Sequence, residues 1–275
     1  MKKYAVLWMM FLGIILGCEK EKPMVFQLDS ELKTALENVK RVRIFFGHQS
    51  VGSNILSGIK EIENQSGGAK INFIEIGKGN IPADGFFAHG KIGKNESPES
   101  KCEAVKNILR SGLGNHVDVV LFKFCFIDIR RKDDEKAILG AYKDTLAMLR
   151  SEFPGVKFIP ITVPLTVNEK SWKYMIKKIL KRETEKDHNG KRNEFNRLLK
   201  ETFKGEAIFD LAEIESRREN GSREEFKLGE NTYYSLVPKY SSDGSHLNDY
   251  GSKMVGKELI LFLGRLIPEK EKSIG

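Results

Sequence analysis

Residues 243–251 read Asp-Gly-Ser-His-Leu-Asn-Asp-Tyr-Gly, and this stretch decides more about the fold than any other part of the chain. It places Asp243 and His246 three positions apart in a glycine-containing turn, just before a segment with the apolar spacing of a helix. A histidine accepts a proton near neutral pH, and a neighbouring carboxylate can hold its ring in one tautomer. The pair therefore indicates a general base and its orienting acid, although an ordinary turn before a helix would use the same residue types.

A serine lies far upstream, where an apolar strand pattern gives way to a helical one. Residues 42–46 read Val-Arg-Ile-Phe-Phe and predict a strand, and apolar residues over 51–62 recur at helical spacing. Ser50 lies between them, near a helix start whose free backbone N–H groups can stabilise an oxyanion. Taken alone, Ser50 is best interpreted as a helix N-cap. With Asp243 and His246 present, it becomes a candidate nucleophile.

Strands and helices alternate between these two ends. The predicted strands cover residues 42–46, 70–76, 117–126, 156–163 and 207–211. The predicted helices cover residues 51–62, 99–109, 134–153, 189–203 and 250–266. A glycine-rich connection is expected over 77–98, and an irregular excursion over one rim of the sheet is expected for 213–240. This alternation favours a mostly parallel sheet in one α/β domain.

The combination resembles the SGNH (GDSL-type) hydrolase family. The resemblance covers about residues 42–266 and is most specific at residues 243–248, whereas Gln49 stands where the family usually has an aspartate before its serine. It implies a flavodoxin-like three-layer α/β/α sandwich with a mostly parallel five-stranded sheet, and ester hydrolysis through an acyl-enzyme without a cofactor. Ser50 would be the nucleophile, His246 the general base and Asp243 its orienting partner.

The resemblance also implies two further oxyanion donors, a glycine after the second strand and an asparagine after the third. Gly93 is the candidate for the glycine, with Gly79 as its rival. Ile127 occupies the place of the asparagine and cannot donate a hydrogen bond. Losing one such donor costs about a hundredfold to a thousandfold in rate, so a working enzyme needs a substitute. Asn95 and Lys123 are the candidates.

Two polar residues near the predicted strands each have two interpretations. Lys123 interrupts an apolar run, and an unpaired ammonium is costly to bury. We expect Lys123 to point into the cleft and pair with Asp128 or a substrate anion, or else to form a structural salt bridge at the sheet edge. His48 could line the pocket beside Ser50, although a packed histidine is more common. The other histidines lack ligand-like spacing, and no metal site is predicted.

The first eighteen residues predict an export signal. Lys2 and Lys3 precede an apolar run, residues 4–17, that is too short to span a bilayer comfortably. The run leads into Cys18 in a sequence that resembles the bacterial lipobox, with an ordinary signal peptide or an uncleaved anchor helix as alternatives. The expected division is a signal peptide at residues 1–18, a tether and lead-in at 19–38, one hydrolase domain at 39–268 and a tail at 269–275.

These features predict an exported esterase held at the periplasmic or outer-membrane side of the envelope, with the lipid anchor as its only membrane contact. Its expected substrate is a small-molecule or glycan ester, such as an O-acyl group of an envelope or extracellular carbohydrate or lipid. A weakly active or inactive glycan-binding module and an O-acyltransferase are the alternatives.

The charge and the cysteines bear on two further questions, whether the chain binds nucleic acid and whether it contains a disulfide. The net charge is +8, but basic and acidic residues are interleaved and no nucleic-acid motif is present, so nucleic acid is not an expected partner. Cys102 and Cys125 could form a disulfide in an exported protein, or remain two buried thiols.

Overall fold

The computed structural model describes residues 29–67, 70–168, 172–180 and 182–266, and a five-stranded sheet lies at its centre. The strands are β1 (Arg43–His48), β2 (Phe73–Glu75), β3 (Phe86–Lys91), β4 (Val119–Phe122) and β5 (Lys157–Pro160). Their order is β2-β3-β1-β4-β5, and every neighbouring pair is parallel. The central strand β1 therefore has β2 and β3 on one side and β4 and β5 on the other, and ligands of such sheets bind beyond the carboxyl ends of the strands near such a central strand.

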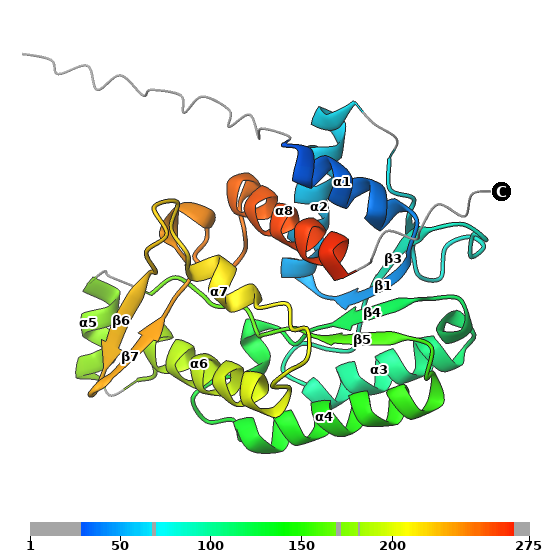
Figure 1. Cartoon of the computed structure of the whole chain (residues 1–275). Helices are drawn as coiled ribbons and strands as arrows, with labels where there is room; N and C mark the ends of the chain where they lie inside the picture. Colours follow the sequence, from blue (N-terminus) through cyan, green and yellow to red (C-terminus); the bar gives the residue numbers. More distant parts are fainter. Residues whose placement is uncertain (1–28, 68–69, 169–171, 181, 267–275) are drawn as a thin grey trace, which may run out of the picture.

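Helices cover both faces of the sheet and make three layers (Figure 1). One face carries α1 (Ser30–Lys40), α2 (Ser50–Ser66) and α8 (Asp249–Leu266), and the other carries α3 (Pro98–Arg110), α4 (Glu135–Glu152) and α6 (Glu185–Thr202). Each face has its own apolar core, because successive strand residues point to opposite sides. The expected flavodoxin-like α/β/α fold is confirmed.

The helices α2 and α8 cross closely, which brings the two ends of the chain together. A Cβ atom at Gly58 of α2 would lie 2.0 Å from the Ser252 carbonyl oxygen of α8, so only glycine permits this approach. Because α2 follows β1 directly and α8 follows the residues 243–248, the crossing fixes where the early and late motifs meet.

The number of strands in the central sheet was predicted correctly, but two assignments were wrong. Residues 207–211 form only an isolated bridge, Ile161 with Phe209, because Asp210 caps the short helix α7 (Leu211–Ser216) and ends the extended segment. The strand that completes the sheet is β3, which lies inside the expected glycine-rich connection. Its apolar pattern stops after three residues, at His89 and Gly90, and its pairing with β1 and β2 makes it a strand.

The stretch 213–240 is also more ordered than predicted. It contains the antiparallel hairpin of β6 (Glu225–Leu228) and β7 (Asn231–Tyr234), which packs on α6. A short helix that was not predicted, α5 (Trp172–Ile179), precedes α6 and lies at the left edge of Figure 1.

The folded domain starts earlier than residue 39. The helix α1 begins at Ser30, within the expected tether 19–38, and buries Leu32, Leu36 and Val39 against α8. The predicted signal peptide with Cys18 and the tail 269–275 lie outside the described residues. Within the described residues, no helix is long and apolar enough to cross a membrane.

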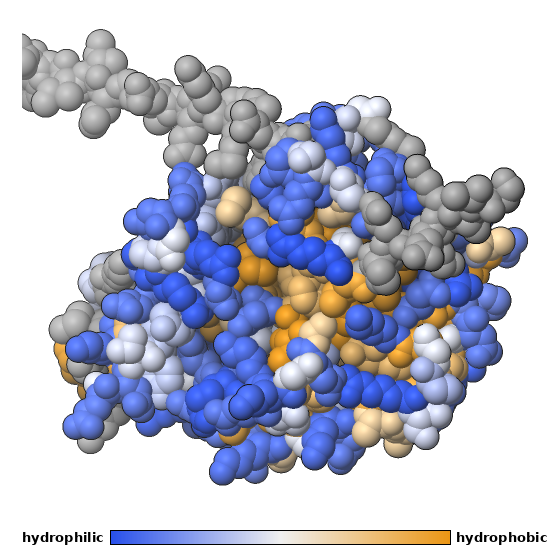
Figure 2. Space-filling model, in the orientation of Figure 1, coloured by the Kyte–Doolittle hydropathy of each residue, from blue (hydrophilic) through white to orange (hydrophobic). Residues whose placement is uncertain are grey.

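Hydrophilic residues cover most of the face drawn in Figure 2. Hydrophobic residues gather in the middle of this view, over β5 and the end of α8 in Figure 1. The cysteines Cys102 and Cys125 are both free and buried, so they do not form the disulfide that was left open.

Candidate active site

Ser50, His246 and Asp243 form one hydrogen-bonded line. Ser50 is the first residue of α2, two positions after the end of β1, and the other two lie in the loop before α8. The Ser50 hydroxyl is 3.0 Å from His246 Nε2, and His246 Nδ1 is 2.7 Å from Asp243 Oδ2. With the ring proton on Nδ1, His246 donates to Asp243 and accepts from Ser50, which is the tautomer a general base requires. The structure thus brings together the three residues selected from the sequence.

The loop that carries the acid and base is held by its own backbone. Asp243 Oδ1 accepts hydrogen bonds from the backbone N–H groups of Ser245 and His246, at 2.8 and 2.7 Å. Gly244 has a φ of +86°, a conformation that favours glycine, and its carbonyl accepts from the Val167 N–H at 2.8 Å. The Asp-Gly-x-His sequence therefore folds into a turn that presents both side chains to one side.

Electrostatics keep Asp243 ionised. Partial burial acts to raise the pKa of Asp243, but the hydrogen bonds from the backbone N–H and ring of His246 and from the Ser245 N–H outweigh it. The pKa of Asp243 is therefore well below its ordinary value. An ionised carboxylate stabilises the imidazolium that forms when His246 takes a proton.

The acid and base lie open to solvent. The Asp243 side chain is 56% exposed and the His246 side chain is 40% exposed. One edge of the His246 ring is covered by Phe126, whose ring centroid lies 5.7 Å away at an angle of 76°. A substrate can therefore reach the serine without entering a deep pocket.

Gln49 has a role that the sequence did not reveal. It is the N-cap residue of α2 but makes no capping hydrogen bond with its side chain. Its amide Nε2 instead donates to the carbonyls of Ile92 and Gly93, at 2.6 and 3.0 Å. The only available signal was its place directly before Ser50, where the family that the sequence resembles usually has aspartate. Gln49 ties the loop after β3 to the start of α2.

This tie links Gly93, rather than Gly79, to Gln49, the residue directly before Ser50. Gly93 has a φ of +52°, and a Cβ atom there would lie 2.6 Å from the backbone of Ser100 and Lys101. Gly79 also has a positive φ, but the space around it is open and it lies in the turn after β2. The geometry favours Gly93 as the oxyanion glycine.

Gln49→Ala is expected to lower kcat/KM for ester hydrolysis about tenfold, because two hydrogen bonds that position Gly93 are lost. The loss should fall mainly on kcat, since an oxyanion donor acts in the transition state. Gln49→Glu is the matched variant, and it should be worse than alanine because it turns an acceptor oxygen toward two carbonyls. Full activity in Gln49→Ala would show that this tie does not position the site.

Lys123 does not face the cleft. Its side chain is fully buried, and its Nζ donates to the Phe124 carbonyl at a long 3.5 Å. The expected pairing with Asp128 is wrong, because the buried ammonium of Lys101 takes that carboxylate. With no exposed surface, Lys123 is not placed to contact a substrate.

Asp128 lies in a buried polar junction, and Asn95 contacts this junction from the exposed side. Asp128 accepts from the backbone N–H groups of Cys125 and Glu96, at 2.6 and 2.8 Å, and from Lys101, whose side chain is fully buried as well. Asn95 is exposed, and its Oδ1 accepts from Lys101 Nζ at 3.3 Å. Among the described residues, no hydrogen bond joins Asn95 to the serine, histidine or aspartate of the site. The junction fastens the loop after β3 to the loop after β4.

His48 is a packed histidine and does not line the surface of the site. It is 2% exposed, its Nδ1 donates to the Gln49 carbonyl at 2.8 Å, and its Nε2 lies 3.4 Å from Nδ1 of His89. A Cβ atom at Gly52 would lie 2.2 Å from the His48 Cβ, so the first turn of α2 rests directly on this ring. Burial is the main reason that the pKa of His48 falls from 6.5 to about 4. The hydrogen bond to the Gln49 carbonyl acts in the opposite direction and raises the pKa, but its effect is smaller.

Acidification is expected to destabilise the protein through His48. The unfolded chain binds a proton at His48 near pH 6.5, whereas the folded chain does so only near pH 4. The free energy of unfolding should therefore fall as the pH drops through this window, by about 3 kcal/mol in total. Urea unfolding at a series of pH values measures this free energy. In His48→Gln it should change less with pH between about 6.5 and 4. Equal slopes in both proteins would contradict this assignment.

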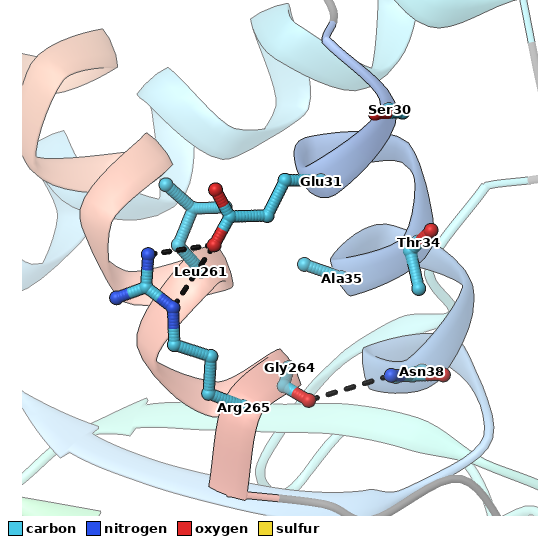
Figure 3. Close-up of a pocket in the computed structure, with 8 residues that line it drawn as sticks. All are labelled: Ser30, Glu31, Thr34, Ala35, Asn38, Leu261, Gly264 and Arg265. Carbon is cyan, nitrogen blue, oxygen red and sulfur yellow. Dashed lines mark hydrogen bonds and ion pairs between the residues drawn. The ribbon is translucent and has the colours of Figure 1, made fainter.

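A cavity of about 260 Å³ lies between α1 and α8 (Figure 3). Arg265 and Glu31 form an ion pair at its mouth, and the Asn38 amide donates to the Gly264 carbonyl at 3.3 Å. None of its lining residues belongs to the hydrogen-bonded line of Ser50, so it is distinct from the candidate site. The described residues contain no cluster of three or more His, Cys, Asp or Glu side chains that could hold a metal.

Comparisons with known proteins find similarity at the level of structure. No protein-family model and no curated protein sequence matches the chain. A Streptococcus pneumonia protein, provisionally described as a platelet activating factor, aligns over 85% of this chain and 90% of its own, with 14% identity and a TM-score of 0.51. This likeness shows a shared fold.

Two further solved structures align less well. A carbohydrate esterase of family 3 from Talaromyces cellulolyticus aligns over 82% of this chain and 98% of its own, with 14% identity and a TM-score of 0.44. A Slackia heliotrinireducens protein, provisionally assigned as an SGNH hydrolase, aligns over 80% of this chain and 97% of its own, with 12% identity and a TM-score of 0.42.

Proposed function

We propose that this chain, whose α/β/α fold is that of the SGNH hydrolases, is a serine ester hydrolase. The observation that carries the proposal is the unbroken line from the Ser50 hydroxyl through His246 to Asp243. A serine hydroxyl is a weak nucleophile until a base removes its proton, and here the base, its tautomer and its orienting carboxylate are all in place.

The chemistry proceeds in two halves. Ser50 Oγ attacks the acyl carbon while its proton passes to His246 Nε2, and the proton then moves to the departing alcohol, leaving an acyl-serine. Water attacks this ester with the same histidine as base, which releases the acid and restores the hydroxyl. The backbone N–H groups of Ser50 and Gly93 are the proposed oxyanion donors.

The proposed substrate is an acyl ester carried on an envelope or extracellular carbohydrate or lipid. The open setting of Asp243 and His246 supports it, because an exposed base can reach an ester on a large carrier. The export and lipid anchoring proposed for the chain rest on residues 1–18 of the sequence. Cys18→Ser should then abolish metabolic labelling of the protein with a fatty acid.

Labelling of the active serine tests the proposal. Protein lacking residues 1–18 is treated with a fluorophosphonate probe and assayed on short-chain aryl esters. We expect a covalent label at Ser50 and ester turnover, both absent in Ser50→Ala and His246→Ala. A folded protein with neither label nor turnover would exclude the esterase and favour a binding protein, whereas a label with transfer to added sugar and no hydrolysis would indicate an acyltransferase.

A further inference from the structure

The short helix α5 exposes an unusual amount of hydrophobic surface. Trp172, Ile176, Ile179 and Leu180 are 69%, 44%, 75% and 56% exposed, and they are four of the six large hydrophobic side chains that are exposed among the described residues. The other two lie apart from them, Ile81 in the connection between β2 and β3 and Met148 on α4. Figure 2 shows hydrophobic atoms at the left edge of the molecule, where Figure 1 places α5.

The four side chains share one face of the helix. Their positions are i, i+4, i+7 and i+8, which is the spacing of an apolar stripe on a helix. The Leu180 N–H donates to the Ile176 carbonyl at 2.9 Å, so the helical turn continues through Leu180. A soluble protein normally buries such a stripe, and an exposed one marks a surface that binds something.

The charge of the segment identifies the partner. Residues 172–182 read Trp-Lys-Tyr-Met-Ile-Lys-Lys-Ile-Leu-Lys-Arg, with five basic residues and no acidic one. Interfaces between proteins are depleted in lysine, whereas helices that lie in the surface of a bilayer combine tryptophan and aliphatic residues with many basic ones. The composition therefore fits an anionic lipid surface better than a second protein.

We propose that α5 docks on the surface of an anionic lipid bilayer. The stripe of Trp172, Ile176, Ile179 and Leu180 enters the boundary between headgroups and acyl chains, and the net positive charge of the segment attracts it to the phosphate groups. This surface is a second membrane contact, in addition to the proposed anchor at Cys18, and it replaces the expectation that the anchor acts alone.

Docking would bring the catalytic loop to the lipid surface. The Val167 N–H donates to the carbonyl of Gly244 in that loop, and Trp172 follows Val167 by five residues. Five residues span at most about 18 Å, so the start of α5 lies near the loop. The docked enzyme would meet ester substrates that are held in or close to the membrane, a consequence that rests on the proposed function.

The tryptophan content allows a direct test. Residues 19–275 contain every described helix and strand and both apolar cores, and Trp172 is their only tryptophan because the other is Trp8. This protein is mixed with vesicles that contain phosphatidylglycerol, or with vesicles of phosphatidylcholine alone. We expect a blue shift of Trp172 emission, quenching by lipids brominated on their acyl chains, and sedimentation with the anionic vesicles that weakens as salt is added.

Matched variants locate the contact. Ile179→Ser with Leu180→Ser should weaken vesicle binding by about tenfold or more, because two apolar side chains no longer leave water. Met148→Ser removes an exposed apolar side chain on α4 and should bind as the unmodified protein does. Thermal unfolding by circular dichroism verifies that both variants are folded.

Three outcomes overturn the proposal: Trp172 emission that does not respond to anionic vesicles, an equal loss in Met148→Ser, or lipid-free self-association that the double variant abolishes. The last would make a second copy of the chain the partner. None of these measurements uses ester turnover, so an inactive protein that still binds vesicles would overturn the esterase proposal and leave the docking surface standing.

Discussion

His246→Ala is expected to lower kcat/KM for an aryl ester by about 10⁴ to 10⁶-fold, because it removes the group that takes the proton of Ser50. Ser50→Ala should cost as much. The effects should not add, since the two residues act as one unit through a 3.0 Å hydrogen bond, and the double variant should be no slower than either single one. Initial rates and single-turnover acylation measure this.

Asp243 provides the graded control. Asp243→Asn keeps an oxygen that can accept the two backbone N–H groups, so the turn should persist, but it no longer holds His246 in the required tautomer. We expect a loss of about 10⁴-fold in protein that remains folded. Turnover in His246→Ala close to that of the unmodified protein would show that Ser50 is not the nucleophile of a triad.

Asp128→Ala is expected to lower the free energy of unfolding by about 3–5 kcal/mol, because it leaves the buried Lys101 ammonium without its carboxylate. The N–H groups of Cys125 and Glu96 also lose their acceptor. Denaturant unfolding measures this loss. In protein that remains folded, ester turnover should fall too, since the junction fastens the two loops beside Gly93.

Two further variants test whether this cost comes from the unpaired buried charge. Asp128→Leu combined with Lys101→Met removes both charges and should recover a large part of the lost stability, because no charge is then buried alone. Glu31→Ala breaks the exposed ion pair with Arg265 and should cost less than about 1 kcal/mol. If Asp128→Ala and Glu31→Ala lowered the free energy of unfolding equally, the buried ion pair of Lys101 and Asp128 would be contradicted.

The features that could be predicted from the sequence were those with local signals. Asp243 and His246 lie within one turn, and Ser50 stands at a junction of strand and helix, so each motif is recognisable in a few residues. Their meeting followed from the general rule that sites form at the carboxyl ends of parallel strands. The apolar residues of α1 are visible in the sequence as well, but residues 19–38 were interpreted as a tether and lead-in.

The features that could not be predicted depend on partners distant in the sequence. Lys123 suggested a charge pair, but the carboxylate of Asp128 is taken by Lys101, which lies 27 residues before it and was not considered. The strand β3 has little pattern of its own and exists because β1 and β2 pair with it. The two hydrogen bonds of Gln49 could be predicted only if the position of the loop after β3 were known, and no local sequence signal gives that position.

The close crossing of α2 and α8 at Gly58 has a consequence for how activity appears during synthesis. Ser50 and His246 are separated by 196 positions, so the nucleophile meets its base only after the last helix has been made and has docked. Such distant contacts form late in folding, because closing a long loop is costly in entropy. An unfinished or still extended chain would therefore not yet have Ser50 beside His246, and the proposed activity would begin only when the fold is complete.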